Sequence, residues 1–546
     1  MANNFEKNQL LQARVEDLTH EGLGVAKIEG FPFFIEGALP QEDIEFKVIK
    51  IGKKYGFGKL EKVVNKSPDR VAITDDIGRQ TGTMTLQHLS YEAQLAFKEK
   101  VVRDAFERIG HFKDLTIQPT MGMDDPWGYR NKAQIPVRMV KSKLETGFFR
   151  KNSHDLIPVE DYHIQDPAID QAILMVRDLL RKYHIPAYDE QAHKGCMRHL
   201  IVRKGHYSGQ LMVILVSKAK KIPQLEELMQ EMIKKIPQLV SIIQNINPAK
   251  TNVIMGKETY CLWGKEYFED QMLEMTFRIS PQSFYQINTP QAERLYQLAI
   301  AAAELDGSET VLDAYCGIGT LSLALAKHAQ AVYAMEVVVE AVEMAEKNAE
   351  INQIDNVHFE AGLAEDWLAR WNQEAIRFDV VTVDPPRKGL DPQFIESLVE
   401  QDPAKIVYVS CNPATQARDC QLLAQAGYQV KSIQPVDLFP FTNHVETVAL
   451  LSKLDINQHI KVKLDMDELD VTASESKATY EEIKNYVLKK HNMKVSNLYI
   501  SQVKKKCGLE VGKNYNVSKK ENPIVPNCPP EKEEAIREAL EYFKMI

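Results

Sequence analysis

The strongest constraint on the fold is a regular alternation of short apolar strands and helices between residues 281 and 454. The predicted strands are ETVLDAY, AVYAMEV, VHFEAG, FDVVTVDPP, IVYVSC and TVALLS, and helical segments separate them. Strands that are apolar along nearly their whole length are buried on both faces, and the intervening helices supply the crossovers that parallel strands need. The pattern therefore predicts an α/β domain with a doubly wound, Rossmann-like parallel sheet.

The chain of 546 residues is long enough for several domains. Residues 1–66 alternate apolar and polar positions between glycines and prolines, which predicts a small β-barrel. Residues 67–280 mix strand and helix patterns and predict an α+β central module, with an amphipathic helix over 91–110. The charge-rich stretch 455–478 is expected to be a linker, and residues 479–546 a small helical appendage.

Composition excludes several classes of protein. The chain has 67 Lys and Arg against 76 Asp and Glu, a net charge of −9, so it is not a uniformly basic nucleic-acid binder. Its seven cysteines are an odd number without a framework spacing, which argues against a disulfide-stapled secreted protein. Neither a signal peptide nor a long apolar run is present. We therefore expect a cytoplasmic protein without a membrane partner.

Two local basic regions stand out against this acidic balance. Residues 47–70 of the predicted barrel carry eight Lys and Arg, ending at Arg70, and are interleaved with Phe46, Tyr55 and Phe57. The central module adds further cations, among them Arg198 and Arg203. Aromatics that stack bases and cations that follow phosphates suit single-stranded nucleic acid. A solvated basic face is an equally good interpretation of the barrel segment and the favoured one for the central module.

The first chemical motif, VLDAYCGIGTLSLALA at 311–326, is a strand that runs into a glycine loop and then a helix. Gly317 and Gly319 allow a nucleotide-like ligand to approach the backbone, and Glu336 after the next strand can accept hydrogen bonds from both ribose hydroxyls. A dinucleotide site needs a third glycine, but Ser322 stands there. The motif therefore predicts S-adenosylmethionine, an adenosine without phosphates, with a plain strand–helix turn as the alternative.

The second motif, FDVVTVDPPRKGL at 378–390, brings Asp384 and two prolines to the carboxyl edge of the sheet, where open α/β folds bind ligands. Amino-methylating enzymes usually place an aromatic residue after the two prolines, and Arg387 stands there instead. Cytosine-5 RNA methylases usually carry a cysteine in this loop, and none is present. A functional loop is favoured over a strand that simply ends in a solvated aspartate.

The third motif, KIVYVSCNPATQARD at 405–419, places Cys411 just past another buried strand. A lone cysteine is usually a small buried hydrophobe, but beside the other motifs it is a candidate nucleophile for C6 of uracil, a soft conjugate-addition acceptor. We expect helix amides or cations to favour the thiolate, with Arg418 as a weak candidate. Cys316 is the rival nucleophile, for which packing inside the glycine loop is the favoured role.

The fourth motif, FTNHVETVALLSK at 441–453, contains Glu446 at the start of the last apolar strand and His444 two residues earlier. A carboxylate at this point could abstract a ring proton. From these residues alone, a surface glutamate is the favoured interpretation.

Five motifs in order along residues 10–453 resemble the bacterial 23S ribosomal RNA uridine-5-methyltransferases, whose N-terminal barrel is a TRAM RNA-binding domain. They are SPQSFYQIN (280–288), LDAYCGIGT, DPPRKG, VSCNPATQARD and HVETVALL. The resemblance implies Cys411 as nucleophile, Glu446 as base and Phe284 as the ring that stacks on a flipped-out uracil. The residues that it implies for S-adenosylmethionine are Gln286, Tyr315, Glu336 and Asp384. It also implies that the helix at 91–110 packs on the catalytic domain.

One departure concerns metal. Many relatives of this kind carry four cysteine ligands for an iron–sulfur cluster, and the matching positions here are Asp75, Thr81, Met84 and Tyr162. None is a thiolate, and a cysteine-ligated cluster needs thiolates. We therefore expect no iron–sulfur cluster, and ordinary packing in its place.

The sequence thus predicts a monomeric enzyme that uses S-adenosylmethionine to convert uridine in 23S ribosomal RNA to 5-methyluridine, through a covalent adduct with Cys411. The same chemistry on transfer RNA is the nearest alternative, and the separate barrel favours ribosomal RNA by analogy only. Cytosine-5 methylation is disfavoured by the cysteine-free DPPRKG loop. A non-catalytic RNA-binding or assembly factor is the third alternative, against which Cys411 and Glu446 speak.

Overall fold

The computed structural model describes residues 5–453, 480–491, 493, 495–507 and 528–542. The chain forms two compact units, Met1–Ile456 and Asn457–Ile546. The linker expected at 455–478 lies outside the described residues. No helix within these described ranges is long and apolar enough to cross a bilayer.

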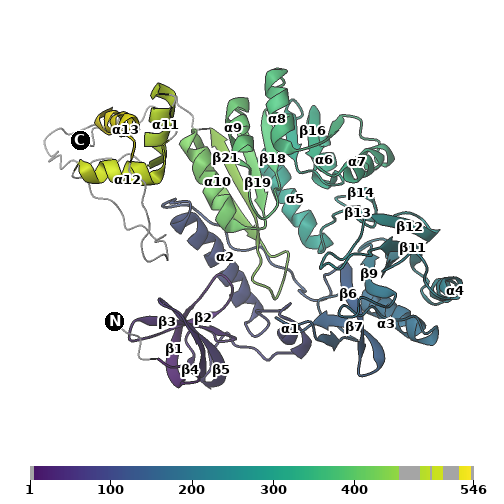
Figure 1. Cartoon of the computed structure of the whole chain (residues 1–546). Helices are drawn as coiled ribbons and strands as arrows, with labels where there is room; N and C mark the ends of the chain where they lie inside the picture. Colours follow the sequence, from purple (N-terminus) through teal and green to yellow (C-terminus); the bar gives the residue numbers. More distant parts are fainter. Residues whose placement is uncertain (1–4, 454–479, 492, 494, 508–527, 543–546) are drawn as a thin grey trace. The chain divides into compact units, whose positions relative to one another are not determined.

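The N-terminal residues form a closed five-stranded barrel in the order β1-β2-β3-β5-β4 (Figure 1). The strands are β1 (Leu10–Leu18), β2 (Gly24–Ile28), β3 (Phe31–Glu36), β4 (Asp43–Ile51) and β5 (Gly56–Asn65). Phe33 and Phe46 fill the barrel core. A Cβ on Gly58 would lie 2.3 Å from the Phe46 ring, so only glycine lets β5 pass this close.

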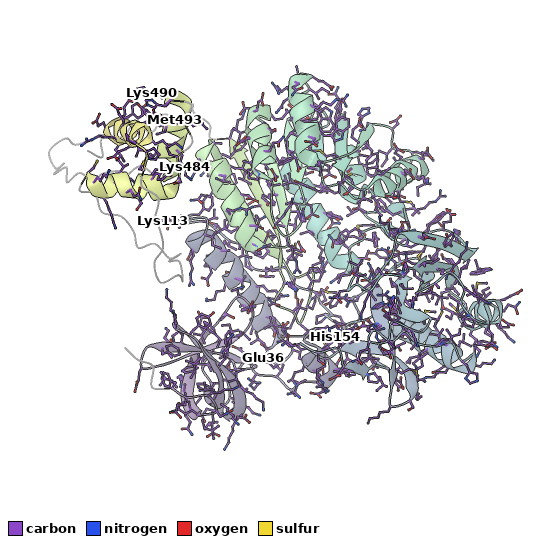
Figure 2. All side chains as sticks on the ribbon, in the orientation of Figure 1. Glu36, Lys113, His154, Lys484, Lys490 and Met493 are labelled. Atoms are coloured by element: carbon purple, nitrogen blue, oxygen red, sulfur yellow. The ribbon has the colours of Figure 1, made fainter. Side chains whose placement is uncertain are left out.

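The basic segment of the barrel differs from the expectation at two residues. Phe46 is fully buried and cannot stack on a base. Arg70 forms a largely buried ion pair with Glu42 (2.5 Å) and does not belong to a solvated strip. The surface aromatics are instead Tyr55 and Phe57, whose ring centroids lie 5.6 Å apart. Lys151 of the central module pairs with Glu36 of the barrel at 2.8 Å; Figure 2 labels Glu36.

The central module is built on a seven-stranded sheet in the order β12-β11-β10-β9-β6-β7-β8. Its strands are β6 (Lys132–Val140), β7 (Lys143–Phe149), β8 (Leu156–Pro158), β9 (Met197–Lys204), β10 (Leu211–Ser217), β11 (Leu239–Ile246) and β12 (Glu258–Gly264). Helices α3 (Pro167–Lys182) and α4 (Leu225–Lys235) pack on it through a shared apolar cluster. The short helix α1 (Asp76–Thr81), the long helix α2 (Tyr91–Arg108) and the hairpin of β13 (Phe268–Met272) and β14 (Met275–Ile279) complete the module.

Two arginines of this module are buried, which corrects the expectation of a solvated face. Arg198 and Arg203 are each 2% exposed. Arg198 donates to the carbonyls of Asn247 (2.8 Å) and Ala249 (2.5 Å). Carbonyl dipoles replace solvent around these cations, so both arginines fix loops of the protein itself.

The positions at which the sequence lacks cluster-ligating cysteines take part in ordinary capping and packing. Asp75 caps α1 by accepting from the amides of Ile77 (2.8 Å) and Gly78 (3.1 Å), and Met84 and Tyr162 lie in one apolar cluster. Within the described ranges, no group of three or more His, Cys, Asp or Glu is arranged to hold a metal ion.

Residues 281–454 contain a seven-stranded sheet in the order β17-β16-β15-β18-β19-β21-β20. Its strands are β15 (Thr310–Ala314), β16 (Ala331–Glu336), β17 (Val357–Ala361), β18 (Val380–Val383), β19 (Lys405–Ser410), β20 (Tyr428–Val436) and β21 (Glu446–Lys453). Five are parallel, as predicted, whereas β21 runs antiparallel to both β19 and β20. The connection from β20 to β21 spans only residues 437–445, too short for the crossover that a parallel neighbour needs.

Helices cover both faces of this sheet, which confirms the doubly wound α/β architecture (Figure 1). One face, with Val311 and Val380, packs on α5 (Thr289–Ala303), α6 (Thr320–Ala326) and α7 (Val339–Ile351). The other face, with Leu312 and Val381, packs on α8 (Ala364–Gln373), α9 (Pro392–Gln401) and α10 (Pro413–Gln425). Helix α2 joins this second face through Val102 and neighbouring side chains, and it contacts α10 and β20.

The second unit is a small helical module by itself. Its helices are α11 (Tyr480–His491), α12 (Asn497–Lys506) and α13 (Pro530–Tyr542). They enclose an apolar core that includes Ile483, Ile500 and Ile536. Lysines on its surface pair with glutamates of α13: Lys490 with Glu538, and Lys506 with Glu533 at 2.6 Å.

A fully buried ion pair fixes the connection between β20 and β21. Lys98 of α2 and Asp437 are both 0% exposed at their side chains and lie 2.5 Å apart. Lys98 also donates to the carbonyl of Phe439 (3.0 Å), and Tyr91 donates to Asp437 (2.9 Å). The amide of Phe441 donates to the Gln94 side chain (2.9 Å). Helix α2 therefore holds the backbone that leads into Glu446.

Removing one partner of this pair should destabilise the protein. Lys98→Met leaves the Asp437 carboxylate buried without a cation, so the free energy of unfolding should fall by about 3–5 kcal/mol. Lys100 lies on the same helix but its side chain is 44% exposed, so Lys100→Met should change it by less than about 1 kcal/mol. Denaturant unfolding followed by circular dichroism measures both, and equal effects would contradict the assignment.

Candidate active site

A single cavity of about 640 Å³ brings the predicted site residues together. Its lining includes Phe284, Gln286, Tyr315, Glu336, Asp384, Cys411 and Glu446. These residues come from motifs far apart in the sequence. The cavity opens at the edge of the sheet where the parallel strands end, the place where open α/β sheets bind ligands.

Strand direction explains why Cys411 and Glu446 meet. Asp384 follows β18 and Cys411 follows β19, which are parallel neighbours. Because β21 runs antiparallel to β19, its first residue lies at the edge where β19 ends. The pairing of Ser410 with Thr447 sets Cys411 beside Glu446, and the Thr447 hydroxyl donates to the Ser410 carbonyl at 3.1 Å.

The glycine loop after β15 has the shape of a nucleoside site. Tyr315, Gly317 and Gly319 all have positive φ, at 69°, 57° and 82°. Glu336 accepts from the amide of Gly317 (3.2 Å) and from that of Val338 (3.0 Å), which holds its carboxylate at the loop. A Cβ on Gly317 would meet nothing within 4 Å, so there is room for a ligand against the backbone.

Ser322 has a structural role where a dinucleotide site would have glycine. It is fully buried and donates to Asp313 at 2.5 Å. Thr382 donates to the same carboxylate at 2.9 Å. These bonds connect α6 to β15 and β18. Because Ser322 occupies the third glycine position, the loop lacks the glycine that a pyrophosphate needs.

Phe284 is an apolar ring held out into the cavity. It is 68% exposed. The buried Arg203 fixes its loop by donating to the carbonyls of Ser280 (2.8 Å) and Ser283 (2.9 Å). Asn131 donates to the carbonyl of Gln286 at 2.8 Å. This support could not be predicted from the sequence, where the pattern indicates only that Arg203 is one more surface cation.

Two acidic groups lie at this edge, Glu446, which is buried, and Asp384, which is half-buried. Glu446 is 4% exposed, and no hydrogen bond or ion pair among the described residues involves its carboxylate or that of Asp384. Burial raises the pKa of Glu446 well above its usual range, Asp384 adds to the rise, and Arg387 opposes it. Burial and the neighbouring Asp313 raise the pKa of Asp384 to about 7. A buried unpaired carboxylate is costly, so such groups mark functional sites.

The thiol of Cys411 is protonated at neutral pH in the ligand-free protein, which corrects the expectation of a thiolate. Burial, then Glu446 and Asp384, raise its pKa to about 11, and Arg387 opposes the rise. The cation near the thiol is thus Arg387. Arg418 instead pairs with Asp419 at 2.7 Å, so the prediction for Arg418 is wrong.

The two alternative residues also line this cavity. Cys316 is 7% exposed, and burial raises the pKa of its thiol well above the usual range. His444 is half-buried at the same edge, and burial, Arg387 and Lys98 lower its pKa. The predicted roles of all the lining residues remain predictions at this point.

The sheet, the glycine loop and the carboxylate at the end of β16 define a Rossmann-like methyltransferase. The chain belongs to the tRNA (Uracil-5-)-methyltransferase family, whose sequence model matches residues 90–454. A TRAM domain matches residues 5–60, the barrel. The expected family of RNA uracil-5-methyltransferases with a TRAM domain is thereby confirmed, and the chain is an enzyme of that class.

Relatives cover the first unit of the chain. An uncharacterized RNA methyltransferase of Enterococcus faecalis is 50% identical over 448 residues, 82% of this chain and 98% of the relative. One of Lactiplantibacillus plantarum is also 50% identical, with the same coverage. The crystal structure of Pyrococcus abyssi tRNA (uracil-54, C5)-methyltransferase in complex with S-adenosyl-L-homocysteine is 29% identical, with a TM-score of 0.65, and covers 81% of this chain and all of the other. Both family models end by residue 454, so the second unit lies outside them.

The raised pKa of Cys411 makes its reactivity depend on pH. In the ligand-free protein, alkylation of Cys411 by iodoacetamide should accelerate about tenfold per pH unit above neutrality, because only the thiolate reacts. The rate should level off near the pKa of about 11. Arg387→Ala removes the opposing cation and should slow the reaction at any pH below the plateau. Mass spectrometry of the Cys411 peptide measures the rate, and a plateau near the usual thiol pKa of ~8.5 would contradict the burial argument.

Proposed function

We propose that this enzyme methylates C5 of uracil in 23S ribosomal RNA through a covalent bond between Cys411 and C6. The observation that carries the proposal is the pairing of β19 with β21, which brings a thiol beside a buried carboxylate that has no hydrogen-bond or ion-pair partner among the described residues. A thiol and an unpartnered carboxylate at one edge suit a reaction that needs a nucleophile and later a base. S-adenosylmethionine is the methyl donor, and the residues proposed to hold it are Gln286, Tyr315, Glu336 and Asp384.

The first chemical step belongs to Cys411. Its Sγ adds to C6 of the uracil, the C5–C6 double-bond electrons move toward C5 and the neighbouring carbonyl, and an enolate forms. Because the thiol is protonated at neutral pH, its proton must leave as the bond forms. Asp384, with a pKa of about 7, is matched to accept that proton at neutral pH. Phe284 stacks on the uracil and keeps its C6 over the sulfur.

The last chemical step belongs to Glu446. After C5 has received the methyl group, Glu446 removes the remaining C5 proton. The electron pair of that C–H bond re-forms the C5–C6 double bond and expels Cys411 as a thiolate, which regains a proton. Arg387 supports this step, because it favours the ionised form of Glu446 against the effect of burial.

The role of Glu336 can be tested by binding alone. Glu336→Gln keeps the shape but loses the charge that a ribose diol would donate to, so the affinity for S-adenosylmethionine should fall by about 1.5–3 kcal/mol. Glu340→Gln, an exposed glutamate on the following helix, is the matched control. Isothermal titration calorimetry measures both, and an unchanged affinity in Glu336→Gln would remove this residue from the site.

The steps that need Cys411 and Glu446 should occur at different times in the reaction, so variants of the two residues should stop it at different stages. Cys411→Ala should abolish both turnover and covalent attachment to RNA. Glu446→Gln should allow addition and methyl transfer and then stall, leaving a protein–RNA adduct that survives denaturing electrophoresis and carries the labelled methyl group. A general base contributes about 10²–10⁴-fold, so slow release is consistent.

Two outcomes would contradict these roles. If Glu446→Gln turns over at the wild-type rate, Glu446 is not the base and His444 is the next candidate. If Cys411→Ala still forms the adduct, the nucleophile is misassigned and Cys316 must be tested. Cys261→Ala, at an exposed cysteine, serves as the control and should behave like the wild type.

The RNA itself requires a direct comparison. Two features favour ribosomal RNA: the resemblance of the motifs to the 23S ribosomal RNA enzymes, and the separate barrel. The Pyrococcus abyssi relative, in contrast, is named for transfer RNA. Unmodified 23S ribosomal RNA and unmodified transfer RNA, each incubated with enzyme and tritiated S-adenosylmethionine, separate the two. We expect label in the ribosomal RNA, recovered as 5-methyluridine on nuclease digestion. Label confined to transfer RNA would overturn the ribosomal assignment and leave the chemistry intact.

A further inference from the structure

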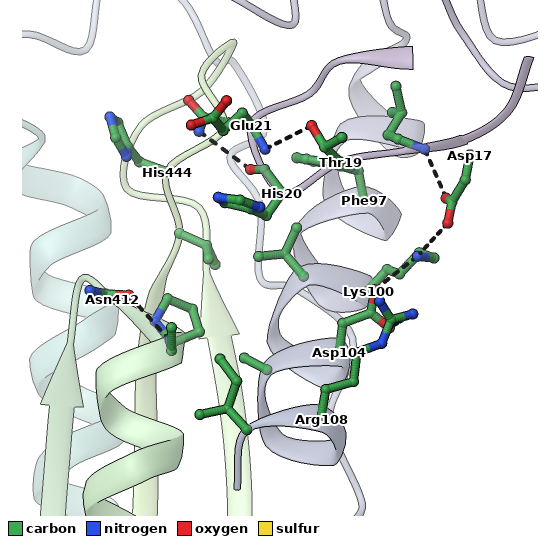
Figure 3. Close-up of a pocket in the computed structure, with 18 of the residues that line it drawn as sticks. Asp17, Thr19, His20, Glu21, Phe97, Lys100, Asp104, Arg108, Asn412 and His444 are labelled. Carbon is green, nitrogen blue, oxygen red and sulfur yellow. Dashed lines mark hydrogen bonds and ion pairs between the residues drawn. The ribbon is translucent and has the colours of Figure 1, made fainter. Parts of the chain in front are cut away.

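A second cavity, of about 740 Å³, lies between the barrel, α2 and the catalytic edge. Figure 3 shows the turn between β1 and β2, with Thr19, His20 and Glu21, facing the loops that carry Asn412 and His444. Helix α2 forms the remaining wall with Lys100, Asp104 and Arg108. We call this cavity the flanking groove.

The flanking groove is continuous with the active site. Arg387, Cys411 and His444 line both cavities. The side chain of Asn443 donates to the carbonyl of His20 at 3.4 Å, so the barrel contacts the segment that leads into Glu446. A polymer whose uracil reaches Cys411 therefore has its next residue at the mouth of the groove.

The charges of the groove favour a base over a phosphate. Lys27 pairs with Glu16 at 2.8 Å, and Lys100 pairs with Asp17 at 3.1 Å. Lys100 and Arg108 also lie 3.0 and 3.5 Å from Asp104, respectively. These cations are already neutralised, and the carboxylates beside them repel a phosphate.

Arg387 is different from the other lining cations. In the part of the chain that the structure describes, no carboxylate lies within ion-pair distance of its exposed guanidinium. It stands on the wall that the two cavities share. An RNA phosphate is therefore attracted to the boundary between the cavities and not into the flanking groove.

The interior walls of the groove are apolar. Phe97, Val101 and Ala105 of α2 face it, together with Val25 of the barrel and Val445 before β21. Apolar walls with a polar rim suit a flat ring that stacks and keeps its polar edge toward water.

We propose that the flanking groove binds the base of the nucleotide next to the target uridine, with their shared phosphate at Arg387. The inference rests on the proposed function, because it needs a uracil at Cys411. Binding of this second base adds to the selection of the RNA site, because an unpaired neighbouring base must unstack from the RNA together with the target uracil. The barrel then contributes to the choice of uridine through the turn at Thr19–Glu21, in addition to any general attraction for RNA.

The test first maps the labelled 5-methyluridine in ribosomal RNA, and then uses a synthetic hairpin with that loop sequence and 5-fluorouridine at the mapped position. Fluorine at C5 cannot be removed as a proton, so the adduct with Cys411 accumulates and can be counted. The base is then deleted from the nucleotide on the 5′ side or on the 3′ side of the target. For the wild type, deletion on one side should weaken RNA binding about tenfold, whereas deletion on the other side should have little effect.

Val101→Trp fills the groove and should remove this discrimination. The variant should bind the intact hairpin about as weakly as the wild type binds the abasic one, with no further loss on base deletion. Ala96→Trp, at an exposed position of α2 outside the groove, is the matched control and should discriminate like the wild type. A loss in Val101→Trp that is equal for intact and abasic hairpins would overturn the proposal.

A second measurement needs no variant. A 4-thiouridine at the neighbouring position should crosslink on irradiation to the Thr19–Glu21 turn or to α2, as mapped by mass spectrometry. Crosslinks confined to other segments, or equal binding of all abasic hairpins, would overturn the groove assignment while the adduct still forms. Absence of the adduct with every hairpin would instead contradict the proposed function.

Discussion

The structure depends on one buried ion pair, between Lys98 and Asp437. Burying two charges away from water is costly, and further hydrogen bonds offset that cost. Tyr91 donates to Asp437, and the carbonyl of Phe439 accepts from Lys98. Through these contacts a helix from the central module fixes the connection that delivers Glu446. The catalytic edge is thus built by segments that lie 339 residues apart in the chain.

The acidic side chains inside the first unit have two kinds of surroundings. Asp313 and Asp437 are surrounded by donors, and their positions are structural. Glu446, which is buried, and Asp384, which is half-buried, lie beside Cys411 with no donor among the described residues. This contrast separates a scaffold from a reactive edge more clearly than sequence motifs do, since all four acids look alike in a linear pattern.

Much of the fold could be predicted from the sequence, and so could the meeting of the candidate site residues in one cavity. Apolar strand patterns gave the doubly wound sheet, and the motifs placed Asp384, Cys411 and Glu446 at strand ends. The supporting contacts could not be predicted, because periodicity counts Lys98 and Arg203 as polar positions and cannot say that carbonyls far along the chain replace water around them. The prediction of a thiolate at Cys411 was wrong for a related reason. Burial of the thiol depends on tertiary packing, which a sequence motif does not reveal.

The antiparallel course of β21 has a consequence for how this chemistry can be lost. Cys411 and Glu446 are aligned by backbone pairing between Ser410 and Thr447, and successive residues of a strand point to opposite faces. A slip of one residue in this register would keep the sheet and its hydrogen bonds but turn the carboxylate away from the thiol. An inserted residue between 437 and 445 is therefore expected to silence the proposed chemistry without unfolding the protein. The length of this connection then matters as much as the identity of the proposed base.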